Sequence, residues 1–364
     1  MIARPAGAAA VLVALAACTS PVAPSPASPV GTIEVAARAA HSATVLDDGT
    51  VLIAGGCVVD GCGVGSVDAF ALTGSSAIAV GSMGAPRDVH TATLLQSGDV
   101  LVTGGFSAEG QPPLASAEVF DAATGSWRPV DALATQRGGH AAALLGSGRV
   151  VVAGGWVRSR TYTATTEVFD PATGSFSPGP DLPAAADGLE AVALEDGRVL
   201  VTGGQSAPGV ASDQAVLIAA DGTSLDATGP LGTARFKHTM VSLDDGRVLV
   251  IGGTTDDIEL LTSTEIFDPA TGRFEPGPTL LHGRYKMSGG ATLLPDGRVL
   301  VGGGGEGVEV IDVEAGVSTK ATAASGVASF GTISVSGSLV LMVGGYDERI
   351  GLTGRFLAVP IADL

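Results

Sequence analysis

The chain has 364 residues and a formal net charge of -18, from 19 lysines and arginines against 37 aspartates and glutamates. So acidic a surface repels phosphate backbones, which excludes nucleic acid as a partner. Glycine is frequent, with 54 residues, and 20 prolines accompany it. Long helices tolerate neither residue well, whereas short strands joined by tight turns use both. The composition therefore indicates an all-β protein.

The first 31 residues have the pattern of an export signal followed by a spacer. Arg4 precedes an apolar run, Ala8 to Ala17, that is too short to span a bilayer. The run ends in the sequence LAAC (15–18), which resembles a bacterial lipobox. We therefore expect a signal peptide over residues 1–17, lipid on Cys18, and a Pro/Ser/Ala-rich tether over residues 18–31. An ordinary signal peptide with an incidental cysteine is the alternative.

Two further cysteines, Cys57 and Cys62, lie in the segment CVVDGC. An exported protein meets an oxidising compartment, so we expect these two to form a disulfide within the loop. Without a nearby histidine they make at most half a zinc site. We therefore expect neither a metal nor another cofactor.

A repeat of about 49 residues fills the rest of the chain. Each copy has an apolar segment, a turn with glycine, a second apolar segment and a glycine pair, as in HTATLLQSGDVLVTGG (90–105). The first glycine of each pair stands at 55, 104, 154, 203, 252, 303 and, in a worn copy, 344. Two apolar runs around an Asp-Gly or Ser-Gly turn predict a hairpin. Runs such as VLVI predict strands that are buried on both faces.

The second half of the unit is clearest in AEVFDAATGSW (117–127), TEVFDPATGSF (166–176) and TEIFDPATGRF (264–274). We interpret Glu-Val-Phe as a third strand with one polar face, the next residues as a turn, and the aromatic as the start of a fourth strand. Four antiparallel strands per repeat are typical of propeller blades. On its glycine pairs, Glu-Val-Phe-Asp strands and Thr-Gly turns, the segment 32–364 resembles a kelch-repeat β-propeller, like the central propeller of galactose-oxidase-like proteins.

The resemblance implies seven four-stranded blades around a central channel. The seventh copy supplies candidate strands near 330–335, 339–343 and 354–360 but lacks a fourth. The segment 32–37 precedes the first blade and has no other partner. We predict that it closes the last blade as the outer strand, which hides an edge that would otherwise aggregate. Six blades are the alternative, with the worn copy as decoration.

Strand alternation brings the loops after the glycine pairs to the same face as the loops between blades, so we expect binding residues there. An Arg-x-x-His pattern precedes four blades, and a further arginine stands before the sixth. One interpretation is a set of basic groups around the channel mouth that binds an anion. The other is that these residues lock adjacent blades together. The arginines are Arg38, Arg87, Arg137, Arg235 and Arg284.

Aromatic residues are expected on the same face, as platforms that stack on sugars or clamp peptides. Phe106 and Trp156 directly follow a glycine pair, and Tyr285 and Tyr346 lie in comparable loops. Packed loop bases are the alternative. The pattern also breaks, with Ala186 and Leu189 in blade four and Lys286 and Gly289 in blade six. Such asymmetry can shape a one-sided pocket.

No catalytic motif is recognisable: a G-x-S-x-G elbow in a strand-turn-helix setting and a zinc-binding helix motif are both lacking. Some kelch-like propellers are enzymes, including copper-radical oxidases and a periplasmic sialic-acid epimerase. We expect a monomeric, lipid-anchored binding or protein-interaction scaffold at the bacterial cell envelope, on its periplasmic or outer side, with a protein or glycan partner. A carbohydrate-active envelope enzyme similar to the epimerase is the alternative.

Overall fold

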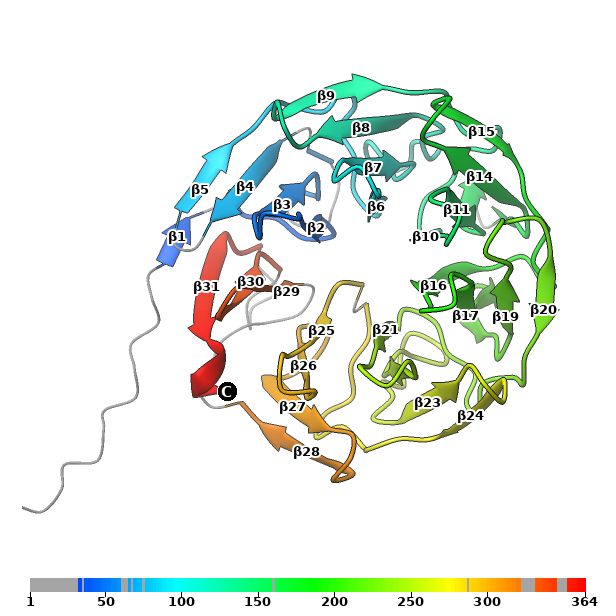
Figure 1. The fold of residues 1–364 in the computed structure, drawn as a ribbon, viewed down its shortest axis with the longest axis vertical. Coiled ribbons are helices and arrows are strands. Elements are labelled where there is room, and N and C mark those ends of the chain that lie inside the picture. The colour runs from blue at the N-terminus through cyan, green and yellow to red at the C-terminus, as the bar shows by residue number, and fades with distance from the viewer. Residues whose placement is uncertain are drawn as a thin grey trace, which may run out of the picture.

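The structure is a computed structural model that describes residues 32–34, 36–59, 65–66, 68–73, 76–158, 161–286, 288–321, 331–345 and 352–364. Seven antiparallel sheets stand around a central axis, one blade after another in chain order (Figure 1). The predicted all-β propeller with seven blades is therefore confirmed, and the alternative of six blades is wrong. No helix among the described residues is long and apolar enough to cross a bilayer.

Within each blade the strands follow one another from the axis to the rim. Blades one to three consist of β2 (Ser42–Val45), β3 (Val51–Ala54), β4 (Ala69–Thr73) and β5 (Ser76–Ala79); β6 (Thr91–Leu94), β7 (Val100–Thr103), β8 (Ala117–Asp121) and β9 (Ser126–Pro129); and β10 (Ala141–Leu144), β11 (Val150–Ala153), β14 (Thr166–Asp170) and β15 (Ser175–Pro178). Blades four to six consist of β16 (Asp187–Ala193), β17 (Val199–Ala207), β19 (Ala215–Ile218) and β20 (Leu225–Ala227); β21 (Thr239–Ser242), β22 (Val248–Ile251), β23 (Thr264–Asp268) and β24 (Arg273–Pro276); and β25 (Ala291–Leu293), β26 (Val299–Gly302), β27 (Val308–Asp312) and β28 (Val317–Lys320).

The last blade takes strands from both ends of the chain. It consists of β29 (Thr332–Ser336), β30 (Leu339–Val343), β31 (Arg355–Pro360) and, as its outer strand, β1 (Thr32–Glu34). β1 pairs antiparallel with β31, with Ile33 opposite Phe356. The prediction that the N-terminal segment closes the last blade is confirmed. A single turn of 3-10 helix, η2 (Ile361–Asp363), follows β31.

The core lies between the blades, because each radial sheet packs on both neighbours. In blades one, two, three, five and six the second strand is buried at every position, and its residues alternate between the two interfaces. In β3, Val51 and Ile53 pack with blade seven, whereas Leu52 and Ala54 pack with blade two. Among the described residues each of the seven blade interfaces has its own hydrophobic cluster.

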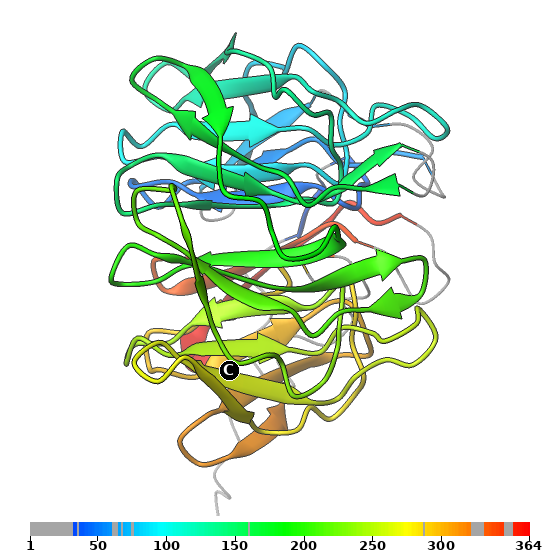
Figure 2. The ribbon, with the colours of Figure 1, turned by 90° about the vertical axis from the view of Figure 1, so that its right-hand side faces the viewer.

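The two faces of the ring carry different connections. The loops after the glycine pairs and the loops that open each blade lie on one face, which we call the loop face; the other is the turn face. Three short strands add ribbons to the loop face of blades three and four (Figure 2). They are β12 (Trp156–Arg158), β13 (Thr161–Tyr162) and β18 (Val210–Ala211).

Deleting residues 32–35 would leave the outer edge of β31 without a partner strand, while its inner edge stays paired with β30. We expect the melting temperature to fall by roughly 2–8 °C, since a few kcal/mol of strand pairing and packing are lost, and aggregation to increase. Calorimetry and light scattering measure both. A protein shortened only to residue 32 is the matched control, and equal melting temperatures for the two would contradict the role of β1.

Candidate functional site

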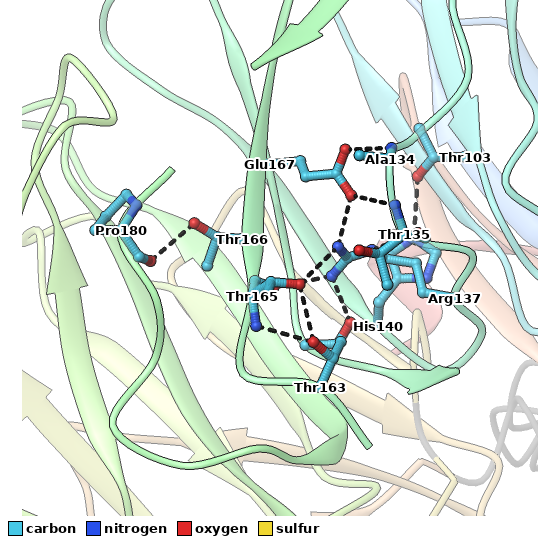
Figure 3. Close-up of polar contacts among 11 residues, drawn as sticks. Thr103, Ala134, Thr135, Arg137, His140, Thr163, Thr165, Thr166, Glu167 and Pro180 are labelled. Atoms are coloured by element: carbon cyan, nitrogen blue, oxygen red, sulfur yellow. Dashed lines mark hydrogen bonds and ion pairs between the residues drawn. The ribbon is translucent and has the colours of Figure 1, made fainter. Parts of the chain in front are cut away.

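A buried arginine–glutamate pair lies at the start of most blades. In blade three, Arg137 Nη2 is 2.7 Å from Glu167 Oε1 (Figure 3). Arg137 Nη1 also donates to the carbonyl oxygen of Gly154 at 2.8 Å. Glu167 accepts hydrogen bonds from the backbone N–H groups of Ala134 and Thr135 at 2.7 and 3.0 Å. The pair therefore joins the loop that opens the blade to its second and third strands.

The same pair recurs in three further blades: Arg87–Glu118 at 2.6 Å, Arg235–Glu265 at 2.6 Å and Arg284–Glu309 at 2.8 Å. In blade six Arg284, rather than Lys286, takes the repeat position, because the opening loop is longer there. The interpretation of the third strand as half polar needs correction. Its glutamate is buried, since the arginine supplies the opposite charge inside the protein.

Blades one and four depart from the pair in different ways. In blade one Phe70 stands in place of the glutamate, and the guanidinium of Arg38 lies 4.7 Å from the ring centroid and 3.6 Å from Asp68. In blade four Ala186 and Val216 replace the two charged residues and pack in one hydrophobic cluster. A buried charge needs its partner, so joint replacement by apolar residues is what a structural pair predicts.

The glycine pairs let the backbones of adjacent blades meet. The second glycine of a pair donates its N–H to the carbonyl oxygen of the residue that opens the next blade, as Gly105 does to Arg137 at 2.9 Å. Gly104 has a φ of 60°, and a Cβ on it would lie 2.3 Å from the same oxygen. No residue with a side chain fits there, which explains the repeated Gly-Gly.

The histidine of the pattern contacts the preceding blade. His140 Nε2 lies 2.9 Å from the hydroxyl oxygens of both Thr91 and Thr103. Burial, and then the arginine of the same pattern, hold the pKa of His140 well below its usual value, so the ring is neutral. Blade four has Leu189 in this position and packs it against Ala141 of blade three. An apolar contact has replaced a polar one at the same interface.

These contacts correct the expectation of accessible basic groups around the channel. The guanidinium groups of the five predicted arginines are fully buried, so none is open to an anionic ligand. Their contacts fit the alternative interpretation, in which they lock the ring together. The five are Arg38, Arg87, Arg137, Arg235 and Arg284.

Near the axis, the opening loops form a circumferential series of hydrogen bonds, which we call the axial belt. In blades one to six a residue at the equivalent position has a positive φ, and in blades two to five its N–H donates to the carbonyl oxygen of its counterpart in the preceding blade. The bonds run from Val89 to Ala40, Gly139 to Val89, Gly188 to Gly139 and Lys237 to Gly188, at 3.2, 3.1, 3.0 and 2.9 Å. Blade six continues the series of positive φ values with Lys286.

Charged side chains gather where blades four to six meet the axial belt. Lys237 forms an ion pair with Asp257, from the loop after β22. Asp187 is buried and accepts a hydrogen bond from Gln205 at 3.0 Å; burial raises the pKa of Asp187 to about 6, which this bond and Lys237 oppose. Burial, and then repulsion by Lys237, lower the pKa of Lys286. We call Asp187, Lys237, Asp257 and Lys286 the axial cluster.

Glu190 lies next to the axial cluster, on the innermost strand of blade four. It is half-buried and takes the place that Thr91 has in blade two. Burial raises the pKa of Glu190 to about 8, and the neighbouring side chain of Ser288, in the longer opening loop of blade six, opposes this shift. Glu190 therefore holds a proton at neutral pH.

Aromatic side chains form a second group above blades two and three. The rings of Phe106 and Trp156 meet edge to face with centroids 5.8 Å apart, and Trp156 and Tyr162 do so at 6.5 Å. All three are partly exposed. Phe106 lies against the backbone of Gly138, where a Cβ would approach its ring to 2.3 Å. We call Phe106, Trp156 and Tyr162 the aromatic cluster.

A shallow depression adjoins the aromatic cluster on the loop face. It is lined by Gln136 and Thr135 from the opening loop of blade three and by Val157, Arg158 and Tyr162 from the ribbon β12–β13. The depression therefore combines an aromatic surface with amide, hydroxyl and guanidinium groups. Tyr162 was not predicted, because it follows the glycine pair by seven residues and nothing in the repeat singles it out.

The remaining predicted residues are dispersed. Tyr285 lies apart from the aromatic cluster, with Lys286 Nζ 5.2 Å from its ring centroid. Cys57 is buried and disulfide-bonded, but Cys62 lies outside the described residues, as do Tyr346 and Cys18. The disulfide pairing, the lipid and the tether stay predictions. Within the described ranges, no group of three or more His, Cys, Asp or Glu side chains is arranged to hold a metal ion.

Comparisons with known proteins agree with the geometry of the blades. The family model described as the Kelch motif matches residues 137–183 and 238–281. The two matched segments begin in the opening loops of blades three and five. The solved structure of YjhT is similar, with a TM-score of 0.61 and 15% identity over 78% of this chain and 97% of that chain. Likeness at this identity concerns the fold alone. A search of curated proteins found no match.

Arg137→Ala should leave Glu167 buried without a counter-charge. We expect a loss of about 3–5 kcal/mol in the free energy of unfolding. The double variant Arg137→Ala/Glu167→Val copies blade four and should recover a large part of this loss. Urea unfolding compares the two variants with the wild type. A double variant no more stable than the single one would contradict the assignment of a structural pair.

Glu190→Gln should remove a pH dependence of stability. The folded pKa of Glu190, about 8, lies above the ordinary glutamate value of 4.5, so the folded protein binds the extra proton between these values. The stability from this group is complete below pH 4.5 and is lost as the pH rises through 8. We expect urea unfolding to give equal stabilities at pH 4 or below and a more stable variant at pH 9. The exposed Glu195→Gln serves as control and should follow the wild type.

Proposed function

Because the chain is a seven-bladed kelch-repeat β-propeller, we propose that it is a non-catalytic binding or protein-interaction scaffold. Lipid on Cys18 would hold it at the bacterial cell envelope, and its partner would be a glycan or a protein of that envelope. Since one fold hosts many functions, the proposal depends on the site rather than on the propeller. The observation that carries it is the aromatic cluster on the loop face.

The aromatic cluster has the composition of a recognition surface. Phe106, Trp156 and Tyr162 present partly exposed rings, and burial of such rings against a ligand is strongly favourable at low entropic cost. The adjoining depression offers Gln136 and Thr135 as hydrogen-bonding groups. Ring faces beside amide and hydroxyl groups suit a sugar ring or an extended peptide.

The direction of β1 supports the proposed anchoring. Third strands leave the loop face and run to the turn face, and β31 is the third strand of blade seven. β1 is antiparallel to β31, with Thr32 opposite Leu357, so the chain enters β1 from the side of the turn face and runs toward the loop face. A tether from Cys18 would therefore join the propeller on the side opposite the aromatic cluster. The loop face would point away from the membrane, where a partner can reach it.

A carbohydrate-active envelope enzyme is a second candidate, and the axial cluster with its neighbour Glu190 is the observation that favours it. Asp187 and Glu190 have pKa values raised by burial to about 6 and about 8, a range suited to proton transfer at neutral pH. Under this candidate, Asp187→Asn or Glu190→Gln would abolish turnover of a sugar that the protein still binds. Under the scaffold proposal, no sugar that binds is converted.

Trp156→Ala should weaken binding in a screen of glycans and envelope extracts, because the central ring of the aromatic cluster is lost. We expect the affinity for a ligand of the wild type to fall about tenfold or more. Binding is measured on immobilised purified protein, and each hit is incubated and analysed for chemical conversion.

Ile78→Ala is the matched control, since it also removes an exposed apolar side chain, on β5 at the rim of blade one. Circular dichroism verifies that both variants fold. A hit that Trp156→Ala retains at full affinity would overturn the assignment of the aromatic cluster as the binding surface.

A further inference from the structure

Asp88, in the opening loop of blade two, has a buried carboxyl group without a partner. The residue is 3% exposed, and within the described residues no hydrogen bond or ion pair reaches its carboxyl group. The other buried acids in that part of the chain each accept a hydrogen bond; they are Glu118, Glu167, Asp187, Glu265 and Glu309. An unpaired buried polar group is costly, so packing alone does not explain Asp88.

Blade four shows why Asp88 is unpaired. Asp187 takes the equivalent position there and lies opposite Gln205 in antiparallel pairing. The two side chains meet, with the amide of Gln205 donating to the carboxyl group at 3.0 Å. In blade two the residue opposite Asp88 is Phe106, whose side chain has no hydrogen-bond donor. An aromatic ring therefore stands where blade four supplies the partner of the acid.

The same pairing places Asp88 beside the aromatic cluster. Asp88 and Phe106 exchange two backbone hydrogen bonds of 2.9 Å, so their side chains project from the same face of the pair, with Cβ atoms about 5 Å apart. The ring of Phe106 in turn meets Trp156 edge to face, with centroids 5.8 Å apart. A carboxyl group therefore lies at the base of the aromatic surface.

The carboxyl group of Asp88 is buried but not sealed from solvent. Its oxygens are not among the fully enclosed, unpaired polar atoms, which include the Nδ1 atoms of His90 and His140. Burial alone raises the pKa of Asp88 to about 7. The adjacent Arg87 is bound to Glu118 at 2.6 Å, so it does not neutralise Asp88. A cation that arrives from outside would therefore meet an acid without a counter-charge.

We propose that Asp88 receives the ammonium group of a lysine side chain from a partner protein, with the stem of that lysine packed on the rings of Phe106 and Trp156. Aromatic faces attract cations, and a carboxylate forms a charge-assisted hydrogen bond with an ammonium group. The inference rests on the proposed function, and it selects a protein rather than a glycan as the partner at the aromatic cluster.

Two features favour lysine as the group that is bound. Lysine has a compact charged end on a flexible stem, so it fits a narrow opening better than an amino group fixed to a sugar ring. The net charge of -18 also favours a basic partner over an acidic one.

The experiment titrates the purified protein with the peptide acetyl-Gly-Lys-Gly-amide above the pKa of Asp88, and follows binding by NMR of the protein and by tryptophan fluorescence. A second peptide carries ε-acetyl-lysine, which has no charge, and glucosamine tests the amine of a sugar. We expect the lysine peptide alone to bind, and Asp88→Asn to weaken its binding about tenfold or more. Asp131→Asn is the matched control, since it removes an exposed carboxylate from the opening loop of blade three, and it should titrate like the wild type.

Urea unfolding of Asp88→Asn verifies that the carboxyl group is unpaired. The folded pKa of Asp88, about 7, lies above the ordinary aspartate value of 3.8, so the stability from this group is lost as the pH rises from 3.8 through 7. The variant should therefore be more stable than the wild type at pH 9. A variant less stable than the wild type at this pH would reveal a structural partner and overturn the proposal.

The proposal is also overturned if the lysine peptide does not bind, if its acetylated form or glucosamine binds as tightly, or if Asp88→Asn keeps the wild-type midpoint. Trp156→Ala separates this failure from a failure of the proposed function. If ligands from the binding screen depend on Trp156 while the lysine peptide does not bind, the aromatic cluster is still the binding surface and only the role of Asp88 is wrong. If Trp156→Ala retains every ligand, the aromatic cluster itself is wrongly assigned.

Discussion

In blades two, three, five and six, one arginine at the start of the blade makes the contacts on which the ring depends. Its carbonyl oxygen accepts the N–H of the second glycine of the preceding blade, and its guanidinium group binds the glutamate of its own blade, as Arg137 does with Gly105 and Glu167. The carbonyl must approach closely, which demands glycine, and the buried cation demands a buried anion. The most recognisable residues of the repeat, the arginine, the glycine pair and the glutamate, are therefore required by this contact between blades. They carry no information about a ligand.

The candidate groups lie on the loop face, where several blades depart from the repeat either at this junction or in a loop. Blade four fills the space of the pair and of the histidine with Ala186, Val216 and Leu189, so its interfaces no longer need charge. The acids Asp187 and Glu190 next to them are then available for other contacts. Blade six keeps the pair but lengthens the loop that follows Arg284, and blade three adds a ribbon with Tyr162. The repeated contacts supply the frame, and loop-face residues of blades two to six supply the candidate chemistry.

The repeat made the ring, the number of its blades and its closure predictable. The segment 32–37 had no partner strand and the last blade had no fourth strand, so pairing the two completes the ring. The positions after the glycine pairs also indicated that Phe106 and Trp156 share a face. The burial of Arg137 was not predictable, since its partner Glu167 is remote in sequence. The alternation of the third strand placed Glu167 on a polar, solvent-facing side. The meeting of Lys237 with Asp257 depends on left-handed backbone turns, which no residue type other than glycine reveals in a sequence.

The pairing of β1 with β31 has a consequence for biosynthesis. The strand that completes the last blade is the first to leave the ribosome, and its partner is among the last. While the chain is elongating, β1 has no native neighbour, and the seventh sheet cannot assemble at all. Closure of so long a loop delays the final contact. The nascent chain therefore passes through an open ring, whose unpaired strand edges stay exposed until both ends meet.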